Sequence, residues 1–405
     1  MPSLFLAWRY LCARPGQSAV MVLGLALALY LPLVTHRLVD EFDRTIGARA
    51  ASTPLVIGPE GSRFDLALHG LYFRARNNGT VPYSEYTRLV DRHDSTMIPL
   101  HSKFTAKGYP VVGTTVDYFH FRNIGMQPGG KTMRQVGDCE LGATVAKELG
   151  LGPGDTILTD RENLFDLAGD YPLQLNITAV LSPTGTADDM AIFVKLDTAW
   201  IMEGIGHGHD PDLDHNGTSP KLVKTHLEIN PENVGSFHFH GDPATFPLTA
   251  LLAQTENAKD QALLLADYQD NAILQVLKSP DVMAELMGMI LRVRDFLDAH
   301  HALIATAMGA LLALIIALTR RLRAREMETL TLLGCGQGLQ WSLQTAELTI
   351  VLGIAFFGAR ALTALTMLGV IRPLAIVPHS FLPLGLRSIA HYTMTTTLKT
   401  ARCAA

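Results

Sequence analysis

Two long stretches of uncharged, mostly apolar residues interrupt an otherwise mixed pattern along the chain. They occupy residues 18–34, SAVMVLGLALALYLPLV, and residues 302–318, ALIATAMGALLALIIAL. With its flanking residues, each approaches the roughly 20 residues that a helix needs to cross the hydrocarbon core of a membrane. A signal peptide has a similar basic flank, but no small-x-small cleavage site follows the first stretch. We therefore expect two retained transmembrane helices, at residues 18–35 and 301–319.

The basic residues around these stretches predict their orientation. Arg9 and Arg14 precede the first stretch, and four arginines between positions 320 and 325 follow the second. Flanks rich in Lys and Arg stay in the cytoplasm, so both of these ends are expected on the cytoplasmic side. Residues 36–300 must then lie outside the cytoplasm.

The end of the chain has a less regular pattern. Residues 348–371 are apolar apart from Arg360, and residues 373–386 form a weaker, proline-containing apolar stretch. Either Arg360 faces protein or water within the membrane, or it marks a bend at the membrane interface. No acidic residue follows Glu347, whereas five Lys and Arg residues do, which favours a cytoplasmic tail. The pattern is compatible with three membrane helices and with four.

The residues between the two membrane helices predict a folded domain of mixed helices and strands. YPLQLNITAVL alternates apolar and polar residues as a half-buried strand does, and YSEYTRLVDRH has its apolar and aromatic residues at helical spacing. ATVAKELGLGPGDTI predicts a short helix that ends at Gly150, then a turn and a strand. Further strands are expected in TPLVIGP, STMIPLHSKFTAKGYPVVGTT, FPLTALLAQ and AILQVL. THRLVDEFDRTIGARA and SPDVMAELMGMILRVRDFLDAHH are expected to continue the membrane helices outward as stalks.

The composition agrees with a membrane protein. Of the 405 residues, 48% are hydrophobic and 18% are charged, whereas soluble domains carry about a quarter charged residues; the mean hydropathy is +0.20. The net charge of −5 gives no electrostatic basis for binding nucleic acid. The four cysteines match no metal-binding spacing, and only Cys139 falls in the external segment, so no internal disulfide is expected there.

One stretch, GMQPGGKT at residues 125–132, matches the phosphate-binding loop of ATPases letter for letter. Such a loop binds phosphate when it joins a buried strand to the start of a helix. Here Asp117, His120 and Arg122 interrupt the preceding stretch, and the following MRQVGDCELG has no apolar helical period. The stretch is also expected outside the cytoplasm, where ATP is scarce. We interpret the match as a surface turn.

Histidines concentrate in residues 201–242. His207 with His209, and His238 with His240, form two His-x-His pairs, and alternate residues of an extended chain point to one side. Each pair can offer two imidazoles to one ion, and imidazole suits zinc, copper or nickel. The alternative is a solvated loop and a strand whose polar face uses histidine. A zinc-like ion at these four residues is a hypothesis, and the sequence indicates no catalytic residue and no other cofactor.

Several stretches, taken in order, resemble one family of membrane proteins. They are YPVVGTTVDYF, GATVAKELGLGPGDTI, YPLQLNITAVLSPTGTADDMAIFVKLDTAW and RRLRAREMETLTLLGCGQG. With the order of membrane helix, external α/β domain, second helix and basic cytoplasmic segment, the chain resembles the permease subunit of MacB/FtsX/Lol-type ABC transporters over most of residues 1–370. It departs from that family at the C-terminus, where the last helix is absent or degraded.

The resemblance implies an α-helical transmembrane protein with a large extracytoplasmic α/β domain of two lobes, the MacB-like periplasmic core. It also implies a homo- or heterodimer of permeases in a bacterial inner membrane, in contact with lipid and with a periplasmic partner. A separate cytoplasmic ATP-binding cassette subunit would hydrolyse ATP, so the chain itself is not expected to be an enzyme. The expected segments are a cytoplasmic N-terminus (1–17), transmembrane helix 1 (18–35), the periplasmic core domain (36–300), transmembrane helix 2 (301–319), a cytoplasmic coupling segment (320–345), an FtsX-like membrane region with one or two further helices (346–386) and a C-terminal tail (387–405).

The coupling segment contains RRLRAREMETLTLLGC, residues 320–335. Leu322, Met327, Leu330 and Leu333 recur at about helical spacing, so one helical face is apolar. By itself such a helix can rest on the membrane surface. The resemblance implies instead that it docks into the ATPase. The residues assigned to this coupling are Arg325, Glu326, Glu328, Leu330, Leu333 and Gly334, with Gly336 sharing the turn into the next helix.

The sequence thus predicts a mechanotransmission permease, in which ATP-driven movement of the membrane helices passes through the stalks to the external domain. It indicates no particular transported substrate. The alternative is a membrane-anchored periplasmic module that binds metal or senses a signal without transport.

Overall fold

The chain divides into two compact units. The structure is a computed structural model, and it describes all residues except 1, 75–78, 94, 161–171, 208–226, 230–232, 323–327, 330, 331, 333, 335 and 375–405. Unit 1 contains Met1–Thr45 and Met287–Pro373, and unit 2 contains Ile46–Leu286.

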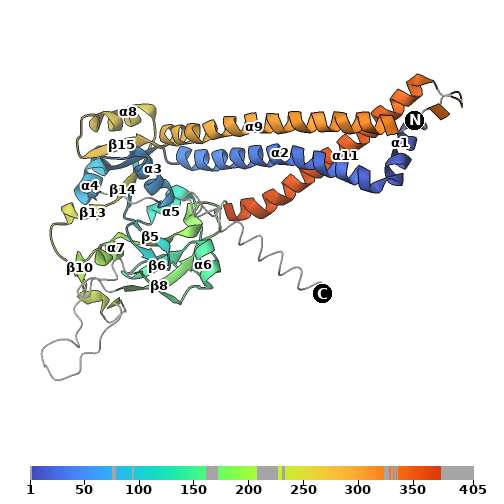
Figure 1. The fold of residues 1–405 in the computed structure, drawn as a ribbon. Coiled ribbons are helices and arrows are strands. Elements are labelled where there is room, and N and C mark those ends of the chain that lie inside the picture. Colours follow the sequence, from blue (N-terminus) through green and yellow to red (C-terminus); the bar gives the residue numbers. More distant parts are fainter. Residues whose placement is uncertain are drawn as a thin grey trace, which may run out of the picture. The chain divides into compact units, whose positions relative to one another are not determined.

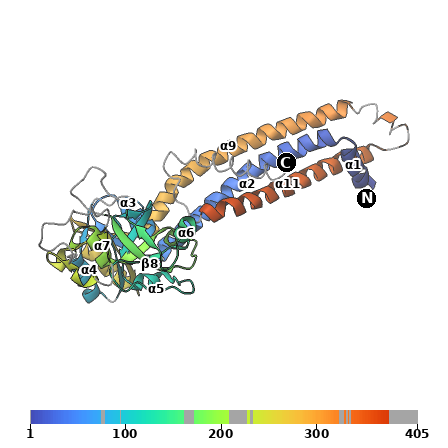
Figure 2. The same cartoon turned by 90° about the horizontal axis from the view of Figure 1, so that it is seen from below.

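Unit 1 is helical (Figure 2). Its helices are α1 (Pro2–Ala13), α2 (Pro15–Ala51), α9 (Ser279–Leu322) and α11 (Gln337–Leu374), of which α2 and α9 continue along the chain into unit 2. The predicted membrane segment at residues 18–35 and the stalk after it are therefore one helix, and the same holds for residues 279–319. α11 runs through Arg360 without interruption, and the guanidinium of Arg360 lies 5.8 Å from the ring centre of Phe356.

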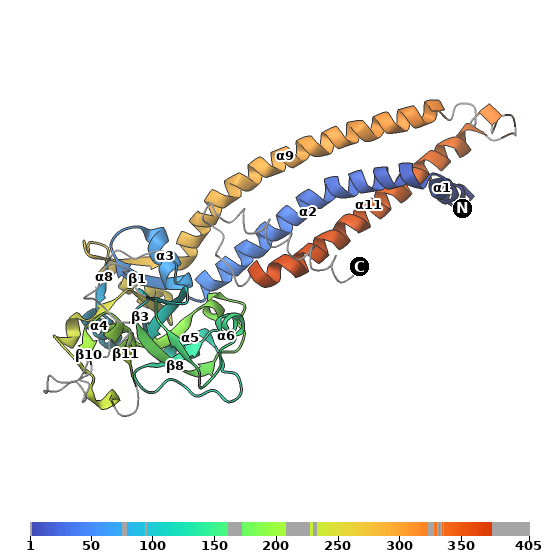
Figure 3. The same ribbon diagram turned by 60° about the horizontal axis from the view of Figure 1, so that its bottom comes forward.

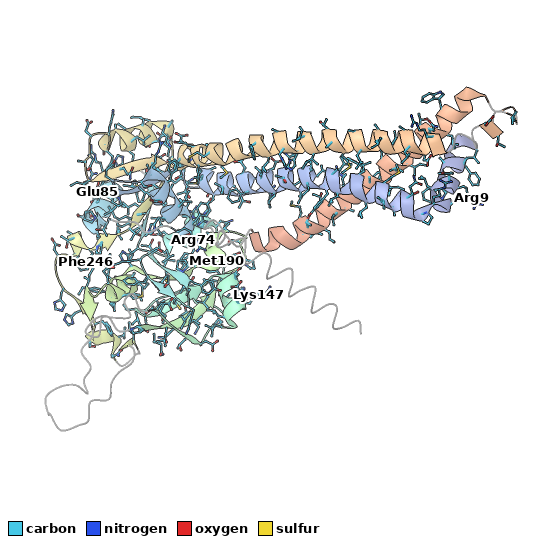
Figure 4. All side chains as sticks on the ribbon, in the orientation of Figure 1. Arg9, Arg74, Glu85, Lys147, Met190 and Phe246 are labelled. Atoms are coloured by element: carbon cyan, nitrogen blue, oxygen red, sulfur yellow. The ribbon has the colours of Figure 1, made fainter. Side chains whose placement is uncertain are left out.

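Two helices in the described part of the chain are long and apolar enough to cross a membrane, Pro15–Ala51 and Trp341–Leu368. Figure 4 shows side chains projecting from α2, α9 and α11. Large apolar side chains on these helices are exposed, among them Leu23, Leu27, Leu303, Leu314, Phe357 and Leu365. Small or β-branched residues spaced four apart on α11 are instead buried: Val351, Ala355, Ala359 and Thr363. Small residues let helix backbones approach closely. A contact of 3.2 Å between His36 Nε2 and Asp298 Oδ1 joins α2 to α9.

Unit 2 is an α/β unit with two main sheets (Figure 1). The first has four antiparallel strands in the order β15 (Leu274–Lys278), β1 (Leu55–Pro59), β14 (Ala250–Thr255) and β3 (Ser95–Leu100). α3 (Arg63–Tyr72) and α8 (Ala258–Asp267) contact β14, and α4 (Tyr83–Arg92) contacts β3. The sheet buries a core that includes Leu55, Ile57 and Leu251.

The second sheet is mixed and has seven strands. Its order is β11 (Leu227–Glu228), β8 (Leu173–Val180), β6 (Asp138–Leu141), β9 (Ile192–Lys195), β5 (Tyr109–Thr114) and β4 (Thr105–Ala106), with β7 (Thr156–Leu158) also paired to β8. Along β8 the apolar residues are buried and the residues between them are half-buried, as the alternating sequence predicted. α6 (Ala143–Leu149) ends where Gly150 takes a φ of 68°, so the predicted helix end is confirmed.

The remaining elements are short, and one of them joins the two cores. They are β2 (Val81–Pro82), α5 (Asp117–Arg122), η1 (Ala187–Met190), α7 (Leu196–Met202), β10 (Gly206–His207), η3 (Val234–Ser236), β12 (His238–Phe239), η4 (Pro243–Thr245) and β13 (Pro247–Leu248). α7 places Leu196 and Trp200 in the core of the four-stranded sheet and Ala199, Ile201 and Met202 in that of the seven-stranded sheet. The expected α/β class of this part of the chain is confirmed.

Candidate functional site

The last turn of α2 carries a buried arginine. Arg49 is only 6% exposed and lies beside Ala50, which is fully buried. Its Nε donates a hydrogen bond to the carbonyl oxygen of Leu71 in α3, at 3.0 Å. Its Nη2 donates to Asp188 Oδ1 at 2.8 Å, and Nη1 donates to Asp188 Oδ2, so the guanidinium binds the carboxylate with both nitrogens.

Two further side chains complete this cluster, which we call the Arg49 cluster: Arg49, Tyr118, Arg122 and Asp188. The hydroxyl of Tyr118, in α5, donates to Asp188 Oδ1, and Arg49 Nη2 lies 3.3 Å from the same hydroxyl. Arg122, also in α5, donates hydrogen bonds to the hydroxyls of Ser52 and Thr53, directly after α2, at 3.1 and 2.6 Å. The end of α2 is therefore held by side chains or backbone of α3, α5 and η1.

The charges of the cluster depend on one another. Burial by itself would raise the pKa of Asp188, but the charge and hydrogen bonds of Arg49 outweigh it and lower that pKa to about 2. Burial and the neighbouring carboxylate raise the pKa of Tyr118 to about 12. Burial lowers the pKa of Arg49, yet the charge of Asp188 more than compensates, so it is raised overall. Burial and the like charge of Arg49 lower the pKa of Arg122. Because Asp188 stays ionised and Tyr118 neutral near neutral pH, the cluster is a salt bridge with a second arginine close by.

Sequence patterns alone did not predict this cluster. Asp188 and Asp189 both follow SPTGTA and look like turn residues, and both lie in the short 3-10 helix η1. Asp189 accepts hydrogen bonds from Thr184 and Gly185, and Asp188 accepts one from Thr186. Asp188 also reaches Arg49, 139 positions earlier in the chain. The local signal for the cluster is the stretch TIGARAA, in which Arg49 stands among small residues. Small residues let a helix pack closely, so a charged side chain among them is conspicuous.

The GMQPGGKT stretch does not have the strand–loop–helix arrangement of a phosphate-binding loop. The element that follows it is the strand β6, and the next helix, α6, begins only at Ala143. The backbone N–H groups of Gln127 and Lys131 donate to the carbonyl oxygens of Val180 and Thr178, at 2.8 and 3.0 Å, so they face the strand β8. Lys131 is exposed. The interpretation of this stretch as a surface turn is confirmed.

The two His-x-His pairs lie partly within the described residues. The backbone of His207, in β10, pairs with that of His238, in β12. The rings of His238 and His240 are close, with centroids 4.7 Å apart. His209 lies outside the described residues. Among the residues that the structure describes, no group of three or more His, Cys, Asp or Glu side chains is arranged to hold a metal.

The residues assigned to ATPase coupling are also described only in part. Arg325, Glu326, Leu330 and Leu333 lie outside the described residues. Glu328 is exposed, and Gly334 has a φ of 85°, three positions before α11 begins. A positive φ at this position suits glycine. The coupling role itself stays a prediction.

Comparison with known proteins gives matches only among solved structures. No protein-family model and no curated protein matches the sequence. The structure is similar to the periplasmic region of MacB from Actinobacillus actinomycetemcomitans, with 10% identity and a TM-score of 0.33, over 57% of this chain and 91% of that one. It is also similar to the extracellular domain of the noncanonic ABC-type transporter YknZ from Gram-positive bacteria, with 12% identity and a TM-score of 0.31, over 55% of this chain and 98% of that one. Both solved structures are of extracytoplasmic domains, and both likenesses are low in identity and in TM-score.

Proposed function

We propose that this chain is the permease subunit of a mechanotransmission-type ABC transporter in a bacterial inner membrane. A separate cytoplasmic ATPase would move the membrane helices, and α2 and α9 would carry that movement to unit 2. The observation that carries the proposal is the continuity of α2, which runs from the apolar stretch at residues 18–34 to the buried Arg49 without a break. The stretches that resemble the family, above all RAREMETLTLLG, are the reason to propose a separate ATPase as the partner.

The physical requirement for such a device is a stiff connection at each end. A helix transmits a displacement along its axis because its backbone hydrogen bonds run along that axis; in α2, Pro32 has no N–H to donate, so one of these bonds is missing. At its end, the Arg49 cluster attaches α2 to α3, α5 and η1 through directional, charge-assisted hydrogen bonds. A loose loop at this point would absorb the displacement. The exposed apolar side chains of α2, α9 and α11 support a lipid environment for part of unit 1, since soluble proteins seldom expose apolar patches of that extent.

The ATPase connection is tested at the coupling segment. A proline at Gly334, where φ is 85°, cannot be accommodated because proline fixes φ near −65°. We expect Gly334→Pro, and separately Glu326→Lys with Glu328→Lys, to leave the permease inserted and folded but to abolish co-purification of an ATPase and transport. Charges at such an interface set register and specificity. Lys131→Ala is the matched control and should retain both. Retained partner binding and activity in both coupling variants would exclude the proposed role.

The alternative function is a membrane-anchored module that binds metal or senses a signal. The adjacent histidine positions on β10 and β12 favour metal binding. A basic, amphipathic cytoplasmic segment has no purpose in such a module, whereas a permease needs one. Co-purification of membrane partners from cells, followed by their identification, separates the two functions: the permease should bring an ATP-binding cassette protein with it, and the module should not.

A further inference from the structure

The first helix, α1, exposes a run of large apolar side chains. Leu4, Phe5, Leu6 and Trp8 are 59%, 65%, 49% and 51% exposed. Soluble proteins seldom gather large apolar side chains on an exposed surface without a partner for them. Consecutive residues of a helix lie about 100° apart around its axis, so these four side chains face more than one side of α1.

One line along α1 packs against the rest of the protein. Ala7 is fully buried, and Leu11, four positions later, is 8% exposed. The helix ends at Ala13, and Pro15 begins α2, where proline is suited to the first turn because no N–H is needed there. Figure 1 shows α1 at an angle to α2. The hydroxyl of Ser18, in α2, donates to the carbonyl oxygen of Leu11 at 3.1 Å, so this bond joins the two helices at their corner.

The position of α1 along the chain places it beside the membrane. The apolar stretch of α2 starts at residue 18, little more than one helical turn after α1 ends. A helix of 12 residues is about 18 Å long and cannot cross a hydrocarbon core of roughly 30 Å. Because α2 enters the membrane so soon after α1, α1 must lie at the membrane surface. This placement rests on the proposed membrane crossing of α2 and not on coupling to an ATPase.

The charges around α1 fit the anionic surface of a cytoplasmic leaflet. Residues 1–39 contain no Asp or Glu, and Arg9 and Arg14 are exposed. Arg9 directly follows Trp8, a residue type that is enriched where a membrane meets water. The apolar stem of an arginine can lie along acyl chains while its guanidinium stays among the headgroups. A partner protein would cover one side of α1, whereas lipid can contact every side on which apolar residues are exposed.

We propose that α1 lies in the cytoplasmic surface of the membrane, with Leu4, Phe5 and Trp8 among the acyl chains and Arg9 at the headgroups of anionic lipids. The apolar side chains would reach about 5–10 Å into the boundary between headgroups and acyl chains, as those of other surface helices do. Because Ser18 bonds α1 to α2 at the corner, this anchor would hold the cytoplasmic end of α2 at a fixed depth.

Tryptophan fluorescence measures where α1 lies, because the chain has three tryptophans, Trp8, Trp200 and Trp341. The full-length protein with Trp200→Phe and Trp341→Phe keeps Trp8 and is reconstituted into vesicles of equal parts phosphatidylcholine and phosphatidylglycerol. Lipids with bromine close to the headgroup should quench Trp8 more strongly than lipids with bromine at the end of the acyl chain, and iodide in the water should quench it weakly. The variant that keeps only Trp200, which is 6% exposed and belongs to unit 2, is the control and should be quenched by neither lipid.

The preference for anionic headgroups is measured in the same vesicles. Bromine on phosphatidylglycerol should quench Trp8 more than the same bromine on phosphatidylcholine. Arg9→Gln should reduce that preference by up to about fivefold, the effect of one basic residue at an anionic surface. Arg37→Gln removes an equal charge at the other end of the apolar stretch of α2 and should leave the preference unchanged.

Quenching of Trp8 by iodide but not by lipid would place α1 in water and overturn the proposal. Protection from both would indicate a protein surface over α1, and equal quenching by the two brominated headgroups would exclude anionic lipid as the partner. If Trp200→Phe disturbs unit 2, the lipid quenching lost between the wild type and Trp8→Phe gives the same measurement, since both contain the other two tryptophans. A protein that does not enter the bilayer at all counts against α2 as a membrane helix, and so against the proposed function. A protein that enters it with Trp8 unquenched by lipid counts against the placement of α1 alone.

Discussion

A guanidinium that is nearly excluded from water depends on its carboxylate partner, and the Arg49 cluster has one carboxylate for two arginines. Asp188 is 2% exposed and Arg49 is 6% exposed. Removal of one partner from a buried ion pair leaves an uncompensated charge, whereas replacement of both by apolar residues is often tolerated. We therefore expect the free energy of unfolding to fall more when Arg49 or Asp188 is replaced alone than when both are replaced by apolar residues.

We expect Asp188→Asn to destabilise the protein by about 3–5 kcal/mol, because it leaves two arginines without a carboxylate in a buried site. Arg49→Met should have a similar effect, and the double variant should lose less than the sum of the two. A double-mutant cycle on the full-length protein, followed by thermal or denaturant unfolding, measures the coupling. Strictly additive effects would mean that the two side chains do not stabilise each other.

The same pair predicts how stability depends on pH. The pKa of Asp188 is about 2 in the folded chain against 3.8 for the unperturbed group. A depressed folded-state pKa contributes stability that is fully present above 3.8 and is lost as the pH falls toward 2, amounting to roughly 2 kcal/mol. Unfolding measured from pH 5 down to pH 2 should show this loss in the wild type. Asp188→Asn should show less of it, because the titrating group is gone; an equal pH dependence in both would contradict the assignment.

At the scale of elements, Gly130 is the position in GMQPGGKT where a side chain cannot fit. An added Cβ would lie 2.8 Å from the Cβ of Ala179 and 3.3 Å from its Cα, so β8 or the turn would have to move. We expect Gly130→Ala to cost about 1–3 kcal/mol of stability, as overpacking does. Lys131→Ala, at an exposed neighbour, should change stability by no more than roughly 0.5 kcal/mol.

The same two variants test the phosphate interpretation. Because the N–H groups of Gln127 and Lys131 donate to carbonyl oxygens of β8, neither variant should alter the nucleotide dependence of transport in membranes that contain the partner ATPase. Loss of nucleotide binding in Lys131→Ala, with the fold preserved, would restore the phosphate hypothesis.

Elements with a local signal were predictable from the sequence, and those set by distant packing were not. The alternation in β8 and the glycine at the end of α6 each lie within one short window, so pattern and turn chemistry sufficed. β6 and β9 are four residues long and almost wholly buried, so their sequences show no alternation of apolar and polar residues that would predict a strand. α5 contains DYFHFR, too short for a helical period, and the sequence indicated only that it was not a buried strand. The Arg49 cluster combines residues from α2, α5 and η1, and no local pattern relates them.

At the scale of the whole molecule, the seven-stranded sheet and the four-stranded sheet belong to one unit (Figure 3). Side chains of α7 contribute to both cores. Trp200 contacts aromatic residues on two sides, with Tyr83 at 5.3 Å and Phe246 at 5.0 Å between ring centroids. Its Nε1 donates to the carbonyl oxygen of Pro247 at 2.9 Å. The family resemblance implied two lobes but not the helix whose side chains enter both cores.

The orientation of the chain in the membrane follows from the charges that flank its apolar helices. Arg9 and Arg14 precede the apolar part of α2, and four arginines end or follow α9, so both of these ends should remain in the cytoplasm. A reporter fused after residue 200, within α7, should then behave as extracytoplasmic, and one fused after residue 330 as cytoplasmic. Alkaline phosphatase and a fluorescent protein that matures only in the cytoplasm give opposite signals at each position, so each fusion controls the other. A cytoplasmic signal at residue 200 would place unit 2 where a membrane-driven external domain cannot be, and the permease proposal would fail with it.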